Sequence, residues 1–189
     1  FFCKDREFYV DQIDFEQIKR QKGITTVIFD KDATLCFPFS RQLHSRGEKA
    51  LQLARNAQLD LYLLSNDLMV DQHGSNNDFV QPMREDNYAL KLIEHPELRK
   101  PFLPLSDIDR QIKETQAHKV LLVGDRVFTD VVQANRCGFL SFLVSPLIPN
   151  QHDAILSTYS MKTKAFLRCI QFISDFERFH QRWTKEMKK

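Results

Sequence analysis

Two aspartates follow a buried apolar segment near the start of the chain and are spaced to share one site. Asp30 and Asp32 come directly after the run at 24–29, ITTVIF. Side chains two residues apart point opposite ways on a strand, but they can converge if the strand ends between them. Such an end places the carboxylates at the carboxyl edge of a sheet, where open α/β folds bind ligands. The alternative interpretation is an acidic turn that merely closes a strand.

Polar residues of a particular kind also follow two later apolar runs. Ser65 and Asn66 come after LDLYLL. Gly124 is the last residue of KVLLVG, Asp125 follows it directly, and Asp130 comes five residues later. Lys100 lies between these two sets. Because parallel strands share one carboxyl edge, these groups can meet in one crevice.

The chemistry of such a crevice is phosphoryl transfer. Several carboxylates at one point repel each other unless a cation neutralises them, and oxygen ligands of this kind suit Mg²⁺. Asp30 can then attack phosphorus, with Asp32 as acid/base, while the hydroxyl, amide and ammonium groups hold the phosphoryl oxygens. Each group taken singly has a structural interpretation as a turn, a helix cap or a solvated charge. Their joint order at strand ends favours the phosphotransfer site.

The elements that would position these residues alternate along the chain. Continuous apolar runs predict buried strands at 24–30, 59–65, 119–124 and 139–145. Helical patterns predict helices at 47–58, 106–117 and 129–137, the last ended by Gly138. Residues 68–82 read as a loop, and 83–98 fit either a helix at 85–95 or a short strand at 89–93. The predicted fold class is therefore α/β, a doubly wound, Rossmann-like parallel sheet.

The C-terminal part is predicted to form a helix that follows the sheet-forming part of the chain. We expect one phosphatase-like domain at 1–160 and an amphipathic helix at 161–189. An aromatic-rich stripe repeats every three or four positions along that helix: Phe166, Ile170, Ile173, Phe176, Phe179 and Trp183. The stripe can pack against the sheet domain, or it can dock on a protein partner or a membrane interface.

Composition excludes several classes of protein. A formal net charge of +2 and the absence of an RNA-binding signature give no support for nucleic acid as a partner. No apolar run is long enough to cross a bilayer. The four cysteines are far apart and form no C-x-x-C pair, so we read them as reduced thiols and not as a zinc site.

The motifs resemble the haloacid dehalogenase (HAD) superfamily of aspartate-nucleophile phosphatases. The match consists of D-x-D-x-T at 30–34, Ser65, Lys100 and G-D-x-x-x-x-D at 124–130. It is closest to the mitochondrial type of the phosphatidylglycerophosphate phosphatase branch. The segments that carry this closer likeness are FDKDATL, SND at 65–67, RKP at 99–101, VGDRVFTDV at 123–131, NRCGF and LVSPL.

The resemblance implies a role for each matched residue. Asp30 would be the nucleophile and Asp32 the general acid/base, while Ser65, Asn66 and Lys100 would bind the phosphoryl group. Mg²⁺ would be held by the residues that offer oxygen ligands at the motif ends. These are Asp30, Asp32 through its backbone carbonyl, Asp125 and Asp130.

The resemblance also implies an open site and a substrate. The interval between Asp32 and Ser65 leaves no room for a large cap domain. The substrate would be the phospholipid phosphatidylglycerophosphate, within cardiolipin synthesis. The protein would meet it at the matrix side of the inner mitochondrial membrane. One residue departs from the family pattern, since Ala33 stands where Asn or Gly is usual. The alternatives are a phosphatase for another phosphoester and an interaction subunit of a larger mitochondrial complex with weak or no activity.

Overall fold

The part of the chain that the structure describes covers most of the first 150 residues. This computed structural model describes residues 8–40, 42–66, 89–94, 98–112 and 116–150. Between 153 and 169 it describes all but residues 154, 160, 162 and 166. The predicted loop at 68–82 and most of the predicted C-terminal helix lie outside these residues.

Five parallel strands form one sheet in the order β3-β2-β1-β4-β5, which confirms the predicted fold class. Each of the four predicted strands contains an observed one, and the ambiguous segment contributes the short strand β3. The chain therefore builds outward from β1 in one direction and then returns to build β4 and β5 on the other side. The strands are β1 Thr26–Phe29, β2 Asp60–Leu63, β3 Lys91–Leu92, β4 Val120–Gly124 and β5 Leu140–Leu143.

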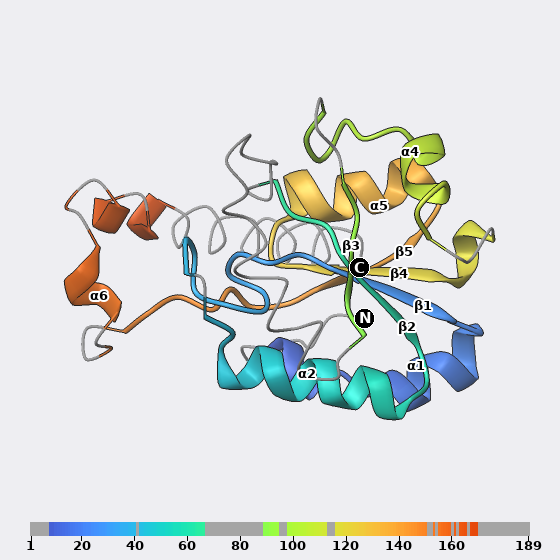
Figure 1. Ribbon diagram of the computed structural model, residues 1–189, viewed down its shortest axis with the longest axis horizontal. Coiled ribbons are helices and arrows are strands. Elements are labelled where there is room, and N and C mark those ends of the chain that lie inside the picture. The colour runs from blue at the N-terminus through green and yellow to red at the C-terminus, as the bar shows by residue number, and fades with distance from the viewer. Residues whose placement is uncertain are drawn as a thin grey trace, which may run out of the picture.

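Helices cover both faces of the sheet (Figure 1). α1 (Phe15–Lys22) and α2 (Ser45–Asn56) lie on one face, and α4 (Leu105–Asp109) and α5 (Val132–Cys137) lie on the other. Alternation along β1 serves both layers: Val27 and Phe29 join the core under α1 and α2, while Ile28 joins the core under α4 and α5. This two-sided burial explains why the strands read as continuous apolar runs.

One helix was not assigned from the sequence, although its ends carry clear signals. α1 begins where the Asp14 carboxylate accepts a hydrogen bond from the Gln17 amide at 2.8 Å. It ends at Gly23, whose φ of +67° is left-handed. A short 3₁₀ turn, η1 (Val10–Gln12), precedes it and packs against α2.

The helix predicted at 106–117 is wrong in length. α4 begins one residue early, at Leu105, but ends at Asp109, and a 3₁₀ turn, η2 (Ala117–Lys119), leads into β4. Ile108 and Ile112 are the buried apolar residues in this stretch, and the sequence after Ile112 is polar, so nothing there anchors further helical turns.

The helix predicted at 129–137 is confirmed, with a wider first turn. Residues Val127–Val131 form a π-helical turn, η3, which continues into α5. The helix ends at Gly138, with φ of +71°, as predicted.

The C-terminal segment is described only in part. α6 spans Ile155–Thr158, and the described residues between 161 and 169 are helical. The Tyr159 hydroxyl donates a hydrogen bond to the Pro38 carbonyl at 2.6 Å, which ties this segment to the loop after β1. Within the described residues, no helix is both long enough and apolar enough to cross a bilayer.

Candidate active site

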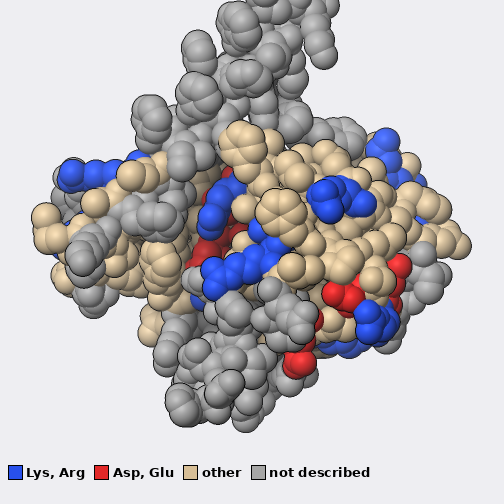
Figure 2. All heavy atoms as spheres, turned by 90° about the horizontal axis from the view of Figure 1, so that it is seen from above, with Lys and Arg blue, Asp and Glu red and all other residues tan. Residues whose placement is uncertain are grey.

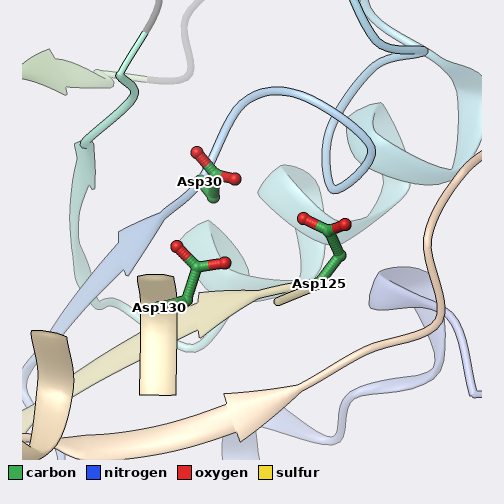
Figure 3. Close-up of side chains that lie close together, drawn as sticks. All are labelled: Asp30, Asp125 and Asp130. Atoms are coloured by element: carbon green, nitrogen blue, oxygen red, sulfur yellow. The ribbon is translucent and has the colours of Figure 1, made fainter. Parts of the chain in front are cut away.

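The centre of the sheet brings the predicted acidic residues together. β1 and β4 are neighbours, and the Asp30 amide donates to the Val123 carbonyl at 2.9 Å, which carries the pairing one residue past β1. Asp30 thus lies beside the end of β4, where Asp125 follows. One carboxylate oxygen each from Asp30, Asp125 and Asp130 lies within 4.8 Å of the others. Figure 3 shows the three carboxylates pointing toward one another from the ends of β1 and β4 and from η3.

Lys100 lies between two of these carboxylates. Its Nζ is 2.7 Å from Asp30 Oδ1 and 2.5 Å from Asp130 Oδ1, and all three side chains are buried. Burial alone would lower the pKa of Lys100, but the carboxylates of Asp130 and Asp30 raise it above its ordinary value. The lysine is therefore a fixed cation that screens the charges of Asp30 and Asp130.

Asp125 fits a cation ligand. Both of its carboxylate oxygens are buried, and neither has a hydrogen-bond partner in the described structure. Burial is the main cause that raises the pKa of Asp125, and the neighbouring charges of Asp130 and Asp30 add to it. A carboxylate in this state is costly unless a cation neutralises it. The all-oxygen donor set of the three aspartates is the kind that Mg²⁺ takes.

Asp130 is held by its own turn. The Arg126 amide donates to Asp130 Oδ2 at 3.1 Å, and the Asp130 amide donates to the Arg126 carbonyl at 2.9 Å. Burial raises the pKa of Asp130 even though Lys100 opposes the shift. A Cβ added to Gly124 would lie 2.3 Å from the Asp130 carboxylate. The glycine of the G-D-x-x-x-x-D motif is thus required for close packing.

Asp32 is buried but is not one of the clustered carboxylates. Its Oδ1 accepts a hydrogen bond from the Phe39 amide at 2.9 Å and lies 3.4 Å from Lys31 Nζ. These contacts hold the Asp32 side chain apart from the cluster of Asp30, Asp125 and Asp130, as a separate acid/base would require. The role predicted for its backbone carbonyl stays a prediction.

Ala33, which departs from the family pattern, adopts the left-handed backbone conformation. Its φ is +59°, its side chain is fully buried, and its carbonyl accepts a hydrogen bond from the Leu147 amide at 2.6 Å. An alanine in this conformation costs about 1 kcal/mol relative to glycine. The surrounding contacts hold the turn in spite of that cost.

Asn66 forms two hydrogen bonds with the main chain of Lys100. Its Oδ1 accepts from the Lys100 amide at 2.7 Å, and its Nδ2 donates to the Lys100 carbonyl at 3.3 Å. These bonds use one of the two Nδ2 hydrogens, so the predicted contact of Asn66 with phosphate stays a prediction. Ser65 is buried beside it, and its predicted contact with phosphate stays a prediction.

One cation at the site was missed in the sequence analysis. Arg126 Nε is buried without a hydrogen bond and lies 3.8 Å from Asp125 Oδ2, while the side chain as a whole is 37% exposed. Burial alone would lower the pKa of Arg126, but the charges of Asp125 and Asp30 outweigh this effect and raise the pKa above its ordinary value. Its position directly after Asp125 in the sequence could have indicated that Arg126 lies at the site. Figure 2 shows Lys and Arg side chains around a hollow in the surface, with acidic atoms at its bottom.

The site carries no domain inserted after its first motif. Residues 33–64, all described except 41, form the loop after β1, α2 and β2. The prediction of no large cap in this interval is confirmed.

The fold and the site together define a class of protein. A five-stranded parallel sheet in this order, with an aspartate cluster and a lysine at the carboxyl ends of β1 and β4, is the HAD-like fold. The family model described as mitochondrial PGP phosphatase matches residues 7–148. The chain therefore belongs to this PGP phosphatase family.

Two curated plant and algal proteins are similar in sequence. Phosphatidylglycerophosphate phosphatase 1, chloroplastic/mitochondrial, of Arabidopsis thaliana is 29% identical over 153 residues, covering 76% of this chain and 43% of the relative. Phosphatidylglycerophosphate phosphatase 1, chloroplastic, of Chlamydomonas reinhardtii is 27% identical over 141 residues, covering 73% and 50%. The chain thus spans half or less of the length of these relatives.

Similarity to solved structures is weaker. An uncharacterized protein from Listeria monocytogenes serotype 4b is 17% identical, with a TM-score of 0.48 over 69% of this chain and 85% of that one. At this level the comparison contributes nothing to the assignment of function.

Proposed function

We propose that this chain is a Mg²⁺-dependent phosphomonoesterase that removes the terminal phosphate of phosphatidylglycerophosphate to leave phosphatidylglycerol. The observation that supports this most is the arrangement around Lys100. Its ammonium group joins Asp30 and Asp130, beside an Asp125 carboxylate that has no hydrogen-bond donor. A fixed cation, a screened nucleophile and a set of oxygen ligands that suits Mg²⁺ are what phosphoryl transfer to a carboxylate needs.

In the first step, an Asp30 carboxylate oxygen attacks phosphorus, and the bond from phosphorus to the leaving alcohol oxygen breaks. Asp32 donates a proton to that oxygen. Lys100 and Ser65 hold the transferring phosphoryl oxygens, and Asn66 positions Lys100 through the two main-chain bonds described above. Bound Mg²⁺, held by Asp30, Asp125, Asp130 and the Asp32 carbonyl, would neutralise the negative charge of the phosphoryl group.

In the second step, water attacks the phosphorus of the aspartyl phosphate. Asp32, now ionised, accepts the proton of that water, and the bond between phosphorus and Asp30 breaks. Inorganic phosphate leaves, and Asp30 returns to its ion pair with Lys100. The same carboxyl group therefore acts as acid and then as base.

The choice of substrate rests on the family and on the printed names of the two relatives. A site without an inserted domain after β1 suits a headgroup that remains attached to a bilayer. We place the reaction at the matrix side of the inner mitochondrial membrane, where a peripheral protein would meet this lipid. The C-terminal residues remain a candidate contact for a protein partner.

The test measures Mg²⁺-dependent release of phosphate from phosphatidylglycerophosphate in vesicles and from soluble phosphomonoesters. Asp30→Asn should reduce release to background, because the amide is not a nucleophile. Asp107→Asn changes a carboxylate of α4 outside the cluster and should leave the rate unchanged. No release from any substrate would favour the interaction subunit, and release from soluble esters alone would overturn the lipid assignment.

A further inference from the structure

Exposed apolar side chains gather on the loops that carry the site. Among the described residues, five large hydrophobic side chains are exposed, and four lie in segments that follow β1, β3 and β4. These four, called here the apolar rim, are Phe39 (48% exposed), Leu98 (45%), Phe102 (64%) and Phe128 (65%). All three segments leave the carboxyl edge of the parallel sheet, so the apolar rim surrounds the edge at which the aspartates lie.

The phenylalanines of the apolar rim are exposed on well-supported backbone. The Phe39 amide is bonded to the Asp32 carboxylate. Beside Phe102, Leu103 exchanges two hydrogen bonds with the buried Gln133 amide of α5, at 3.1 and 2.8 Å. Phe128 belongs to the π-helical turn that holds Asp130. Their exposure is therefore fixed by contacts that also build the site, and large exposed apolar groups of this kind mark interaction surfaces.

Within the three short stretches that carry the apolar rim, the exposed charged side chains are basic. In segments 36–40, 98–104 and 126–137 the single acidic residue is Asp130, which is buried. Arg99 and Arg136 are exposed, and the Arg136 guanidinium lies 5.9 Å from the centre of the Phe102 ring. Figure 2 shows Lys and Arg side chains beside the hollow, among residues that are neither basic nor acidic.

We propose that the apolar rim and its arginines dock this face on an anionic lipid bilayer, with the aspartate site turned toward the headgroups. This inference rests on the proposed function for its orientation. Asp30 is only 5% exposed, so a phosphomonoester must enter the hollow to reach it. If the phenylalanines enter the acyl boundary and the arginines bind lipid phosphates, a headgroup can enter while its chains stay in the bilayer.

The arrangement favours a bilayer over a protein as the occupant. The four apolar side chains come from three separate loops around a polar hollow, and basic side chains lie between them. A protein interface usually has an apolar centre and a polar rim, which is the reverse pattern. Peripheral membrane proteins combine aromatic side chains with Lys and Arg in this way.

The experiment measures flotation of the full chain with vesicles of phosphatidylcholine, with and without phosphatidylserine. Phosphatidylserine supplies negative charge but no phosphomonoester. Phe102→Ser together with Phe128→Ser should weaken binding to the anionic vesicles about a hundredfold, from about tenfold for each lost ring. Arg136→Gln should weaken it about fivefold. Two controls should bind as the unchanged chain does: Met161→Ser, which alters the exposed apolar residue outside the rim, and Arg55→Gln on α2.

The outcomes separate this inference from the proposed function. Hydrolysis of a soluble phosphomonoester should persist in the Phe102/Phe128 variant, since both side chains are exposed while the aspartates are buried. The inference would be overturned if the double variant bound anionic vesicles as well as the unchanged chain does. It would also be overturned if the unchanged chain did not bind them at all. If the unchanged chain does not bind vesicles but forms a dimer, and the double variant does not form that dimer, the apolar rim is a protein contact. Docking without any phosphatase activity would instead overturn the proposed function alone.

Discussion

At the scale of single residues, the site depends on side chains that act through their neighbours. Both polar atoms of the Asn66 amide bond to the main chain of Lys100, and Lys100 in turn holds Asp30. Ala33 forms the tight turn after Asp30 with a positive φ. Neither residue need touch a substrate to affect the reaction.

Replacing Asn66 with alanine should slow catalysis more than it destabilises the fold. Loss of two hydrogen bonds, each contributing about 1 kcal/mol, frees the Lys100 backbone and should lower kcat about 10- to 100-fold. Hydrolysis of a soluble phosphomonoester measures this, alongside the free energy of unfolding in urea. Asn56→Ala, at the exposed end of α2, serves as the control and should change neither. An unchanged kcat in the Asn66 variant would contradict the positioning role.

Replacing Ala33 with glycine should stabilise the protein. The glycine removes the cost of a positive φ, so the free energy of unfolding should rise by about 1 kcal/mol. Urea denaturation measures the change. Ala54→Gly, inside α2, makes the same chemical change at a helical position and should lower the free energy of unfolding by about 1 kcal/mol or more. A loss of stability at both positions would mean that the turn at Ala33 is unstrained.

At the scale of elements, α2 supports the loop that follows Asp30. A Cβ on Gly47 would lie 2.1 Å from the Leu35 carbonyl oxygen, so the first turn of α2 packs directly on this loop. The Leu35 amide donates to the Lys31 carbonyl at 2.9 Å, which closes the turn between the two motif aspartates and α2. The helix therefore fixes the position of Asp32.

Replacing Gly47 with alanine should therefore reduce both stability and activity. The clash is with backbone, which must shift, and we expect a loss of about 3 kcal/mol in the free energy of unfolding. Gly23→Ala is the matched control. No atom lies within 4 Å of its added Cβ, so only its φ of +67° opposes the change, at about 1 kcal/mol. Thermal unfolding and phosphate release report the two effects, and equal losses at the two glycines would contradict the close packing of α2.

At the scale of the whole molecule, the aspartate cluster couples folding to cation binding. The raised pKa of Asp125 and of Asp130 means that the folded protein holds protons that the unfolded chain releases. Without a divalent cation, the contribution of these two groups to stability should therefore be greatest below the ordinary value of 3.8 and fall as pH rises through the raised folded values. Lys100 contributes in another range, since its raised pKa stabilises the fold until pH exceeds its ordinary 10.5.

Mg²⁺ should therefore stabilise the protein most at neutral pH, and Asp125→Asn should remove that effect. In metal-free buffer at neutral pH the variant should be more stable by about 1–2 kcal/mol, because a buried unpaired charge is gone. Its Tm should no longer rise with Mg²⁺. Asp107→Asn, outside the cluster, should keep the full Mg²⁺ response. A Tm that rises equally with Mg²⁺ in both variants would exclude Asp125 as a ligand.

The sheet and the motif residues were predictable because their signals are local. Buried strands give continuous apolar runs, and Asp30, Asp125 and Asp130 follow two of them at fixed distances. Lys100 was placed by its order between motifs, and the structure brings it within an ion-pair distance of Asp30. The early end of α4 was missed because its length depends on what the sheet leaves for it to pack against.

The sequence alone therefore determined the class of fold, the order of the motifs and the chemical types at the site, since each follows from the pattern along the chain. Tertiary structure decided which carboxylates lie together and which one stands apart, because that depends on burial and on contacts between distant residues. It also decided that the Asn66 amide binds the Lys100 main chain and that Arg126 joins the site. The exposure of Phe102 and Phe128 beside that site belongs to the same category, since an aromatic residue in the sequence gives no sign of whether the fold will bury it.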